Sequence, residues 1–239
     1  MADVESVSSG AGSSGTLYVV STPIGNLEDI SFRAVKVLSE VDLIAAEDTR
    51  KTGILLSHYH LHKPTISFFS YNDSKRTAGI LAKLRGGTSV ALVTDAGTPG
   101  ISDPGSRLIS EALNANVPVV SVPGPTAFLP ALIVSGLPAG RFVFEGFLPA
   151  KKGRTKVLEK LRAGDRTVIF YESPHRLLRT LKDLHESLGD REISVARELT
   201  KKFEEIVRGR ISDAIMYFSS KSVKGEFVLV VSGSRSERH

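Results

Sequence analysis

The sequence contains no cysteine among its 239 residues. Disulfide bonds, thiolate nucleophiles and cysteine-ligated zinc are therefore excluded. No apolar run reaches the length of a membrane-spanning helix, so we expect no membrane association. The phosphate-binding pattern GxxxxGK[ST] does not occur, and no Asp-rich metal-binding spacing is present, so we also expect no metal.

The charge of the chain and the composition of its first residues are informative. The formal net charge is +5 and the isoelectric point is about 9.4. Two interpretations stay open: a polyanionic partner, or a mildly basic soluble protein. Residues 1–15 are mostly Ser, Gly and Ala, and we expect a disordered leader there, without the apolar core of a signal peptide.

Apolar runs alternate with helical patterns along nearly the whole chain, which predicts an α/β fold with largely parallel strands. Helical spacing predicts helices over 31–40, 104–114 and 176–188, the second with Asp103 as N-cap and Pro104 at its first position. The expected strands are 17–21, 43–46, 65–69, 89–94, 117–122, 142–147, 167–171, 193–197, 204–208 and 226–231.

The ten expected strands fall into two groups of five. The break lies near PGPTAFLPALIVSGLPAG, residues 123–140. We therefore expect two small α/β domains, 16–122 and 123–233, followed by a polar tail at 234–239, with a ligand cleft between the domains.

Three turns rich in Gly and Pro follow expected strands: STPIGN at 21–26, TDAGTPGISDPG at 94–105 and VPGPT at 122–126. Tight connections need such residues for structural reasons alone, but three at one sheet edge also suit close approach of backbone to a ligand. Asp95 and Asp103 in the second turn disfavour a phosphate and favour hydroxyl groups or a positive charge. A ribose or a sulfonium would fit.

Polar groups follow two further strands. AAEDTRKTG places Glu47, Asp48 and Arg50 after strand 43–46, and FYESPHR places Glu172 after strand 167–171. Helix capping is the simpler role for Asp48 and Ser173. Basic residues gather at 151–156 and 201–202, where they form either a solvated face or a track for phosphates.

Eight segments in order resemble one known family. They are TLYVVSTPIGNLEDIS, AAEDTRKTG, VTDAGTPGISDPG, VPGPTA, EGFLPAKKGR, FYESPHRL, ARELTKKFEE and KGEFVLVV. Over residues 16–233 the chain resembles the ribosomal RNA small subunit methyltransferase I family of the tetrapyrrole methylase superfamily.

The resemblance implies two α/β domains with S-adenosylmethionine in the cleft between them, and usually a homodimer. It implies 2′-O-methylation of a decoding-centre cytidine in 16S-type ribosomal RNA. Relatives often continue into a small helical C-terminal extension, whereas this sequence ends soon after strand 226–231. Naked RNA and an assembled particle therefore both stay open as substrates.

Superfamily contacts predict most of the cofactor residues, and the chemistry of methyl transfer and the basic clusters provide candidates for the other roles, among which the sequence does not single out one base. Base or orienting groups would come from Glu47, Asp48 and Glu172. Phosphates would be held by Arg50, Lys151, Lys152, Arg154, Lys201 and Lys202. The cofactor would be held by Pro23, Gly25, Asp95, Gly97, Thr98, Pro99, Gly100, Ile101, Asp103, Thr126, Ala127, Tyr171, Ala196 and Arg197.

Two other functions compete with this one. A tetrapyrrole-type methyltransferase acting on a small molecule would keep the fold, although the exposed cations speak against it. A non-catalytic RNA-binding assembly factor would keep the cleft as a relic. A bacterial cytoplasm is the expected compartment, with a plastid or mitochondrion as the alternative.

Overall fold

The computed structural model describes residues 14–69 and 74–234. The expected leader, apart from its last two residues, and the expected tail, apart from Ser234, lie outside the described residues. The chain forms two compact units. The first extends to Pro125 without Ile24–Asn26, and the second combines Ile24–Asn26 with the chain from Thr126 onward. Nothing in the sequence pattern indicated that Ile24–Asn26 would join the second unit.

The first unit contains a five-stranded sheet in the order β3-β2-β4-β1-β5, and every pairing in it is parallel. Its strands are β1 (Leu17–Val20), β2 (Leu43–Ala46), β3 (Thr65–Ser67), β4 (Val90–Val93) and β5 (Val119–Val122). All five lie where the sequence predicted a strand. The carboxyl ends of parallel strands meet at one edge, so the turns after β1, β4 and β5 leave the sheet on the same side.

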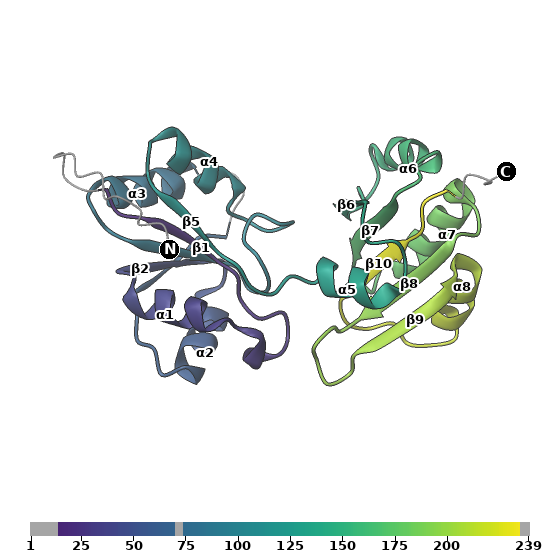
Figure 1. The fold of residues 1–239 in the computed structure, drawn as a ribbon, viewed down its shortest axis with the longest axis horizontal. Helices are drawn as coiled ribbons and strands as arrows, with labels where there is room; N and C mark the ends of the chain where they lie inside the picture. The colour runs from purple at the N-terminus through teal and green to yellow at the C-terminus, as the bar shows by residue number, and fades with distance from the viewer. Residues whose placement is uncertain (1–13, 70–73, 235–239) are drawn as a thin grey trace, which may run out of the picture. The chain divides into compact units, whose positions relative to one another are not determined.

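Helices cover both faces of this sheet (Figure 1). Successive strand residues alternate between two apolar clusters: Leu43 and Ala45 pack with α3 and α4, and Ile44 and Ala46 pack with α1 and α2. Both faces are thus buried, as a parallel sheet requires. The helical segments of the unit are η1 (Leu27–Asp29), α1 (Phe32–Glu40), α2 (Thr49–His58), α3 (Ser74–Arg85) and α4 (Ser106–Asn114).

The second unit contains the other five strands, in the order β6-β7-β10-β8-β9. Only β6 and β7 pair in parallel, and the other three pairings are antiparallel. The expectation of largely parallel strands was wrong here, because β9 follows β8 without an intervening helix and runs antiparallel to it. After this reversal β10 also runs antiparallel to its neighbours β7 and β8. The strands are β6 (Phe142–Phe147), β7 (Thr167–Glu172), β8 (Glu192–Arg197), β9 (Glu205–Arg210) and β10 (Phe227–Val231).

Four helices flank the second sheet: α5 (Phe128–Ser135), α6 (Arg154–Arg162), α7 (Leu177–Leu188) and α8 (Ile211–Ser219). The helices α6, α7 and α8 pack on one face, and α5 packs on the other, as Figure 1 shows. Phe170 and Leu229 face the three-helix side, and Ile169 and Val228 face α5. None of the helices in the described part of the chain is long and apolar enough to span a bilayer.

The expected N-caps of two helices were wrong. The helix α4 begins at Ser106 after Gly105, not after Asp103, because Gly105 adopts φ +129°, outside the helical region. A Cβ at Gly105 would lie 2.8 Å from Leu92 Cδ2. The helix α7 begins at Leu177, and the segment 174–176 is a turn in which the Arg176 amide donates to the Ser173 carbonyl. Ser173 is therefore not its N-cap.

Candidate functional site

The three Gly/Pro turns of the first unit are joined to one another by hydrogen bonds. Thr22 and Gly97 exchange both backbone bonds, at 2.9 and 3.0 Å. The hydroxyls of Ser21 and Thr98 lie 2.8 Å apart, and the Thr98 hydroxyl also donates to the Pro125 carbonyl at 3.1 Å. The expectation that these turns share one sheet edge is confirmed.

The turn after β4 contains glycines at positions where the backbone conformation requires them. Gly97 and Gly100 have φ of +87° and +86°, in the left-handed region that side chains with a Cβ disfavour. The turn can therefore reverse tightly and present backbone amides and carbonyls. Of the predicted cofactor residues, this edge carries Pro23, Asp95, Gly97, Thr98, Pro99, Gly100, Ile101 and Asp103.

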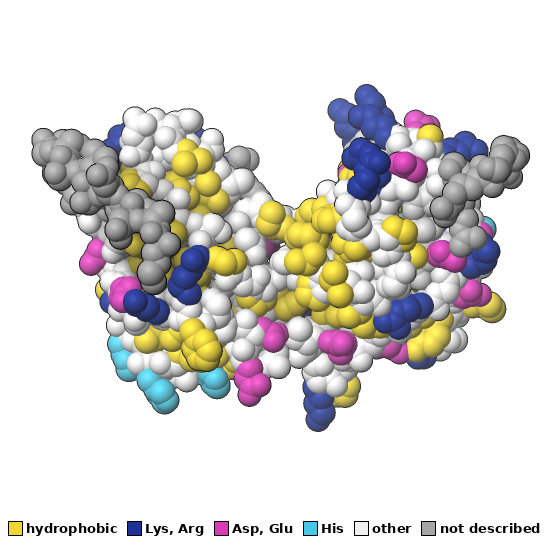
Figure 2. All heavy atoms as spheres, viewed as in Figure 1, with side chains coloured by type: hydrophobic (Ala, Val, Ile, Leu, Met, Phe, Trp, Pro, Cys, Tyr) yellow, Lys and Arg dark blue, Asp and Glu magenta, His cyan; other side chains and the backbone are white. Residues whose placement is uncertain are grey.

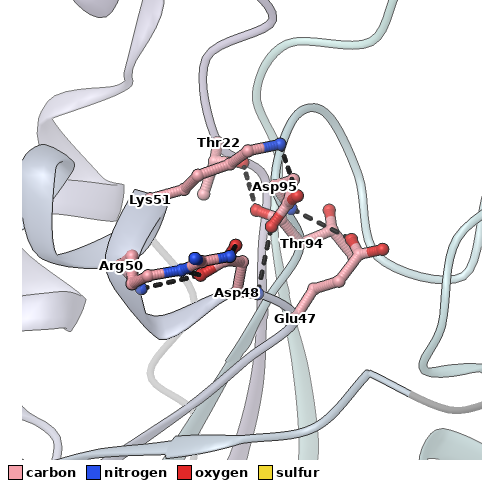
Figure 3. A network of polar contacts seen from close by, with 7 residues as sticks. All are labelled: Thr22, Glu47, Asp48, Arg50, Lys51, Thr94 and Asp95. Carbon is pink, nitrogen blue, oxygen red and sulfur yellow. Dashed lines mark hydrogen bonds and ion pairs between the residues drawn. The ribbon is translucent and has the colours of Figure 1, made fainter.

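A charged cluster lies beside these turns, at the ends of β2 and β4 (Figure 3). Asp95 accepts from the Asp48 amide at 3.0 Å and from the Lys51 ammonium at 2.7 Å. The Asp95 amide donates to Glu47 Oε2 at 3.2 Å. Asp95 thereby ties the start of α2 to the turn after β4, so its oxygens already have partners within the protein.

The two acids of AAEDTR have different electrostatics. Asp48 caps α2 by accepting from the Arg50 amide and pairs with the Arg50 guanidinium at 2.7 Å. The hydrogen bond from that guanidinium lowers the pKa of Asp48 to about 2. Burial, together with the charge of Asp95, raises the pKa of Glu47 above its ordinary value, despite the hydrogen bond from the Asp95 amide. Glu47 is the better proton acceptor of the pair.

Thr94 adds an unsatisfied hydroxyl to this edge. Thr94 is 3 % exposed, and its Oγ1 has no hydrogen-bond partner, whereas its carbonyl accepts from the Thr22 hydroxyl at 3.0 Å. Buried hydroxyls are nearly always hydrogen-bonded, so one left open beside Glu47 and Asp95 fits a bound polar ligand.

The predicted cofactor residues of the second unit lie around the start of α5. Ala127, Tyr171 and Ala196 belong to the apolar cluster beneath α5, and the Tyr171 hydroxyl accepts from the Phe128 amide at 3.3 Å. Arg197 donates to the Lys224 carbonyl and pairs with Glu205. Thr126 precedes Ala127, the residue before α5.

Gly25 is needed for packing inside the protein. A Cβ on Gly25 would lie 2.3 Å from Cγ of Lys201, whose stem crosses the glycine. The Lys201 ammonium bonds Glu198 and Glu226, each at 2.9 Å. These bonds outweigh burial and raise the pKa of Lys201. Lys201 is thus held by two carboxylates, which argues against the predicted role in binding phosphate.

Glu172 and Arg154 form a buried network, which corrects both expected roles. The Glu172 side chain is 0 % exposed and accepts from the Ser173 amide and the Thr180 hydroxyl. Arg154 donates to the same hydroxyl at 2.8 Å and to Asp183 at 2.7 Å. A sealed carboxylate cannot touch a substrate, and a buried guanidinium cannot reach an RNA phosphate.

The other predicted RNA-binding residues differ in availability. Lys151, Lys152 and Lys202 are exposed, with Lys202 above the ring of Phe203. Arg50 is exposed too, but it is paired with Asp48.

Sequence reasoning missed Thr22, Lys51 and Thr94. A polar residue directly after an apolar strand is a signal that could have found Thr22 and Thr94. Lys51 could not have been found this way, because its partner Asp95 is 44 residues away.

The histidines at the end of α2 do not form a metal site. His58 and His62 are four residues apart, but α2 ends at His58, so the two do not share a helical face. Within residues 14–69 and 74–234 no group of three or more His, Cys, Asp or Glu side chains could hold a metal ion.

Comparison with known proteins decides the family. The sequence profile of the tetrapyrrole (corrin/porphyrin) methylases matches residues 16–215. The chain belongs to the tetrapyrrole methylase family.

Within this family, relatives named ribosomal RNA small subunit methyltransferase I are similar to nearly the whole chain. The protein from Synechocystis sp. is 53 % identical over 93 % of this chain and 81 % of its own. The protein from Thermotoga maritima is 51 % identical over 92 % of this chain and 99 % of its own.

Solved tetrapyrrole methylase-like structures share the fold at low identity. Diphthine synthase matches with a TM-score of 0.72 and 15 % identity, over 92 % of this chain and 90 % of its own. Uroporphyrin-III C-methyltransferase from Thermus thermophilus, in complex with S-adenosylhomocysteine, matches with a TM-score of 0.63 and 18 % identity, over 90 % and 97 %.

Proposed function

We propose that this chain, a methyltransferase of the tetrapyrrole methylase family, methylates the ribose 2′-hydroxyl of a decoding-centre cytidine in 16S-type ribosomal RNA. Identity of about half over nearly the whole chain to proteins named as methyltransferases of small-subunit ribosomal RNA carries this proposal. Because these relatives are bacterial, we propose a bacterial cytoplasm, or an organelle with bacterial-type ribosomes, as the compartment.

S-adenosylmethionine is the cofactor, and it supplies a methyl group activated by a sulfonium. The residues of the first unit fit such a ligand in two respects. The turn from Gly97 to Gly100 offers backbone donors and acceptors without side chains, and the open Thr94 hydroxyl awaits a polar partner. In the second unit, Ala127 and Tyr171 offer an apolar and aromatic surface at the start of α5. We propose that these groups hold the cofactor.

The protein's own part in the reaction is to orient the ribose hydroxyl and to accept its proton. We assign the proton to Glu47 Oε1 or Oε2. Burial keeps the pKa of Glu47 raised, so its carboxylate is a stronger base than an ordinary glutamate. Asp48, with a pKa of about 2, is a weak base and holds the start of α2. Positioning alone supplies a large share of the rate in such transfers.

The deciding experiment is transfer of labelled methyl from S-adenosylmethionine to small ribosomal subunits that lack the modification. Protein-free 16S-type RNA and a porphyrinoid precursor are assayed in parallel. We expect label on one decoding-centre cytidine, mapped by its resistance to alkaline cleavage. Label on the porphyrinoid alone would overturn the RNA assignment, and the absence of any transfer despite cofactor binding would favour an assembly factor.

The family resemblance also predicts a homodimer. Light scattering coupled to size-exclusion chromatography measures this directly: a mass of about twice 25.7 kDa is expected.

A further inference from the structure

The segment from Lys151 to Arg162 is strongly basic. It contains six basic residues and one acidic residue, Glu159, so its net charge equals the +5 of the whole chain. Lys151, Lys152, Lys156 and Lys160 are exposed, and no ion pair joins any of them to an acid in the described part of the chain. We call these four residues the α6 lysine surface. Figure 2 shows Lys and Arg side chains gathered in this region.

Arg154, another basic residue of this segment, explains why the α6 lysine surface has a fixed position. Arg154, the first residue of α6, is 5 % exposed and points into the unit. Its guanidinium donates to the Pro149 carbonyl at 3.2 Å as well as to Asp183 and Thr180. The guanidinium therefore fastens the loop before α6 to α7. Leu158 and Leu161 bury the inner side of α6, which leaves the lysines on its outer side.

Several exposed basic groups elsewhere in the described residues have an acidic partner. Arg50 pairs with Asp48, Lys51 with Asp95, and Arg107 with Glu111. Lys156 and Lys160, by contrast, lie four residues apart on one helix, where like charges repel. Four exposed lysines without an acidic partner among the described residues, gathered in one short segment, fit a surface whose anions come from a binding partner.

We propose that the α6 lysine surface binds backbone phosphates of the ribosomal RNA substrate. This inference rests on the proposed function and adds the place where the RNA is held. Phosphate contacts supply affinity and orientation without reading sequence, which suits lysines on a helix and its preceding loop. Each neutralised phosphate also releases counterions, so binding through this surface weakens as salt rises.

The test compares two double variants, Lys151→Ala/Lys152→Ala and Lys156→Ala/Lys160→Ala, with the control Lys36→Ala/Lys83→Ala. The control removes the same charge from exposed positions of α1 and α3 in the first unit. The dissociation constant for protein-free 16S-type RNA and for small subunits is measured across a salt series. Binding of S-adenosylhomocysteine, measured by calorimetry, and thermal unfolding check that each variant is folded.

Each α6 double variant should reduce the slope of log K against log salt by about 1.5 to 2, and the control by less than about 0.5. The KM for RNA in the methyl transfer assay should rise in parallel. Equal slopes and KM values in all three variants would overturn the inference while methylation by the wild type still stands. Weaker binding to subunits with unchanged binding to protein-free RNA would overturn it too, because the lysines would then contact a ribosomal protein. Failure of the wild type to methylate any RNA would instead overturn the proposed function.

Discussion

Glu47 and Glu172 occupy similar places in the two units, yet the fold gives them opposite surroundings. Glu47 directly follows β2, and Glu172 is the last residue of β7. Glu47 accepts a hydrogen bond from the Asp95 amide and lies half-buried at an edge where the Thr94 hydroxyl has no partner. Glu172 is sealed under a hydroxyl, an amide and the guanidinium of Arg176.

The difference teaches that a carboxylate at a strand end is not by itself a functional signal. What separates the two is how many protein donors each carboxylate has. The Glu172 network fastens α6 and α7 to the sheet, so its loss should strongly destabilise the unit. Glu47 has few structural partners, so its loss should affect the reaction and leave the fold intact.

The largest expected effect is on stability. Glu172→Ala removes one partner of a buried ionic network and leaves Thr180 and Arg176 without their acceptor. The free energy of unfolding in urea should fall by about 4 kcal/mol. Glu159→Ala, at an exposed position on α6, is the control and should change it by less than about 0.5 kcal/mol. Similar losses for both variants would contradict the network's role.

The next effect is on activity. Glu47→Gln keeps the size and the acceptor oxygen of the side chain but removes the base. The rate constant kcat for RNA methylation should fall about 100-fold or more, with little change in unfolding free energy. Asp48→Asn is the matched control, and it should affect kcat far less because Asp48 is a cap. A Glu47→Gln enzyme with wild-type kcat would exclude Glu47 as the base.

Glycines make a parallel comparison between the units. Gly25→Ala drives a methyl group into the stem of Lys201, and the free energy of unfolding should fall by about 2 kcal/mol. The cost should largely disappear in a Lys201→Ala background. At Gly100 a Cβ would make only ordinary van der Waals contacts, 3.7 Å to Ile109 Cδ1, and the cost comes from its φ of +86°. Gly100→Ala should therefore lose about 1 kcal/mol regardless of Lys201. Urea titration of the three single and two double variants measures both couplings, and equal costs of Gly25→Ala in both backgrounds would exclude the Lys201 contact.

Several features could be predicted from sequence because they depend on local patterns. All ten strands, the cap at Asp48 and the grouping of the three Gly/Pro turns follow from apolar runs and turn residues. The mixed pairing of the second sheet could not be predicted, because strand direction depends on contacts between distant segments. The burial of Arg154 could not be predicted either, because the segment AKKGR is typical of an exposed surface. Its partners Asp183 and Thr180 belong to α7, which is distant in the sequence.

The smallest expected effect is on the pH dependence of stability, and it distinguishes the two acids of AAEDTR. The pKa of Asp48 falls on folding from 3.8 to about 2, so Asp48 stabilises the fold above pH 3.8 and this stabilisation is lost as the pH falls toward 2. The pKa of Glu47 rises on folding from 4.5, so its contribution is present below pH 4.5 and is lost as the pH rises through the raised value.

Unfolding in urea at a series of pH values tests these opposite signs. Asp48→Asn should flatten the stability profile below pH 4. Glu47→Gln, which resembles the protonated acid, should flatten it just above pH 4.5 and make the protein slightly more stable than the wild type at pH 7. A Glu47→Gln protein that is less stable than the wild type at pH 7 would mean that the Glu47 carboxylate supports the fold, as Glu172 does. The contrast between the two glutamates would then be one of degree.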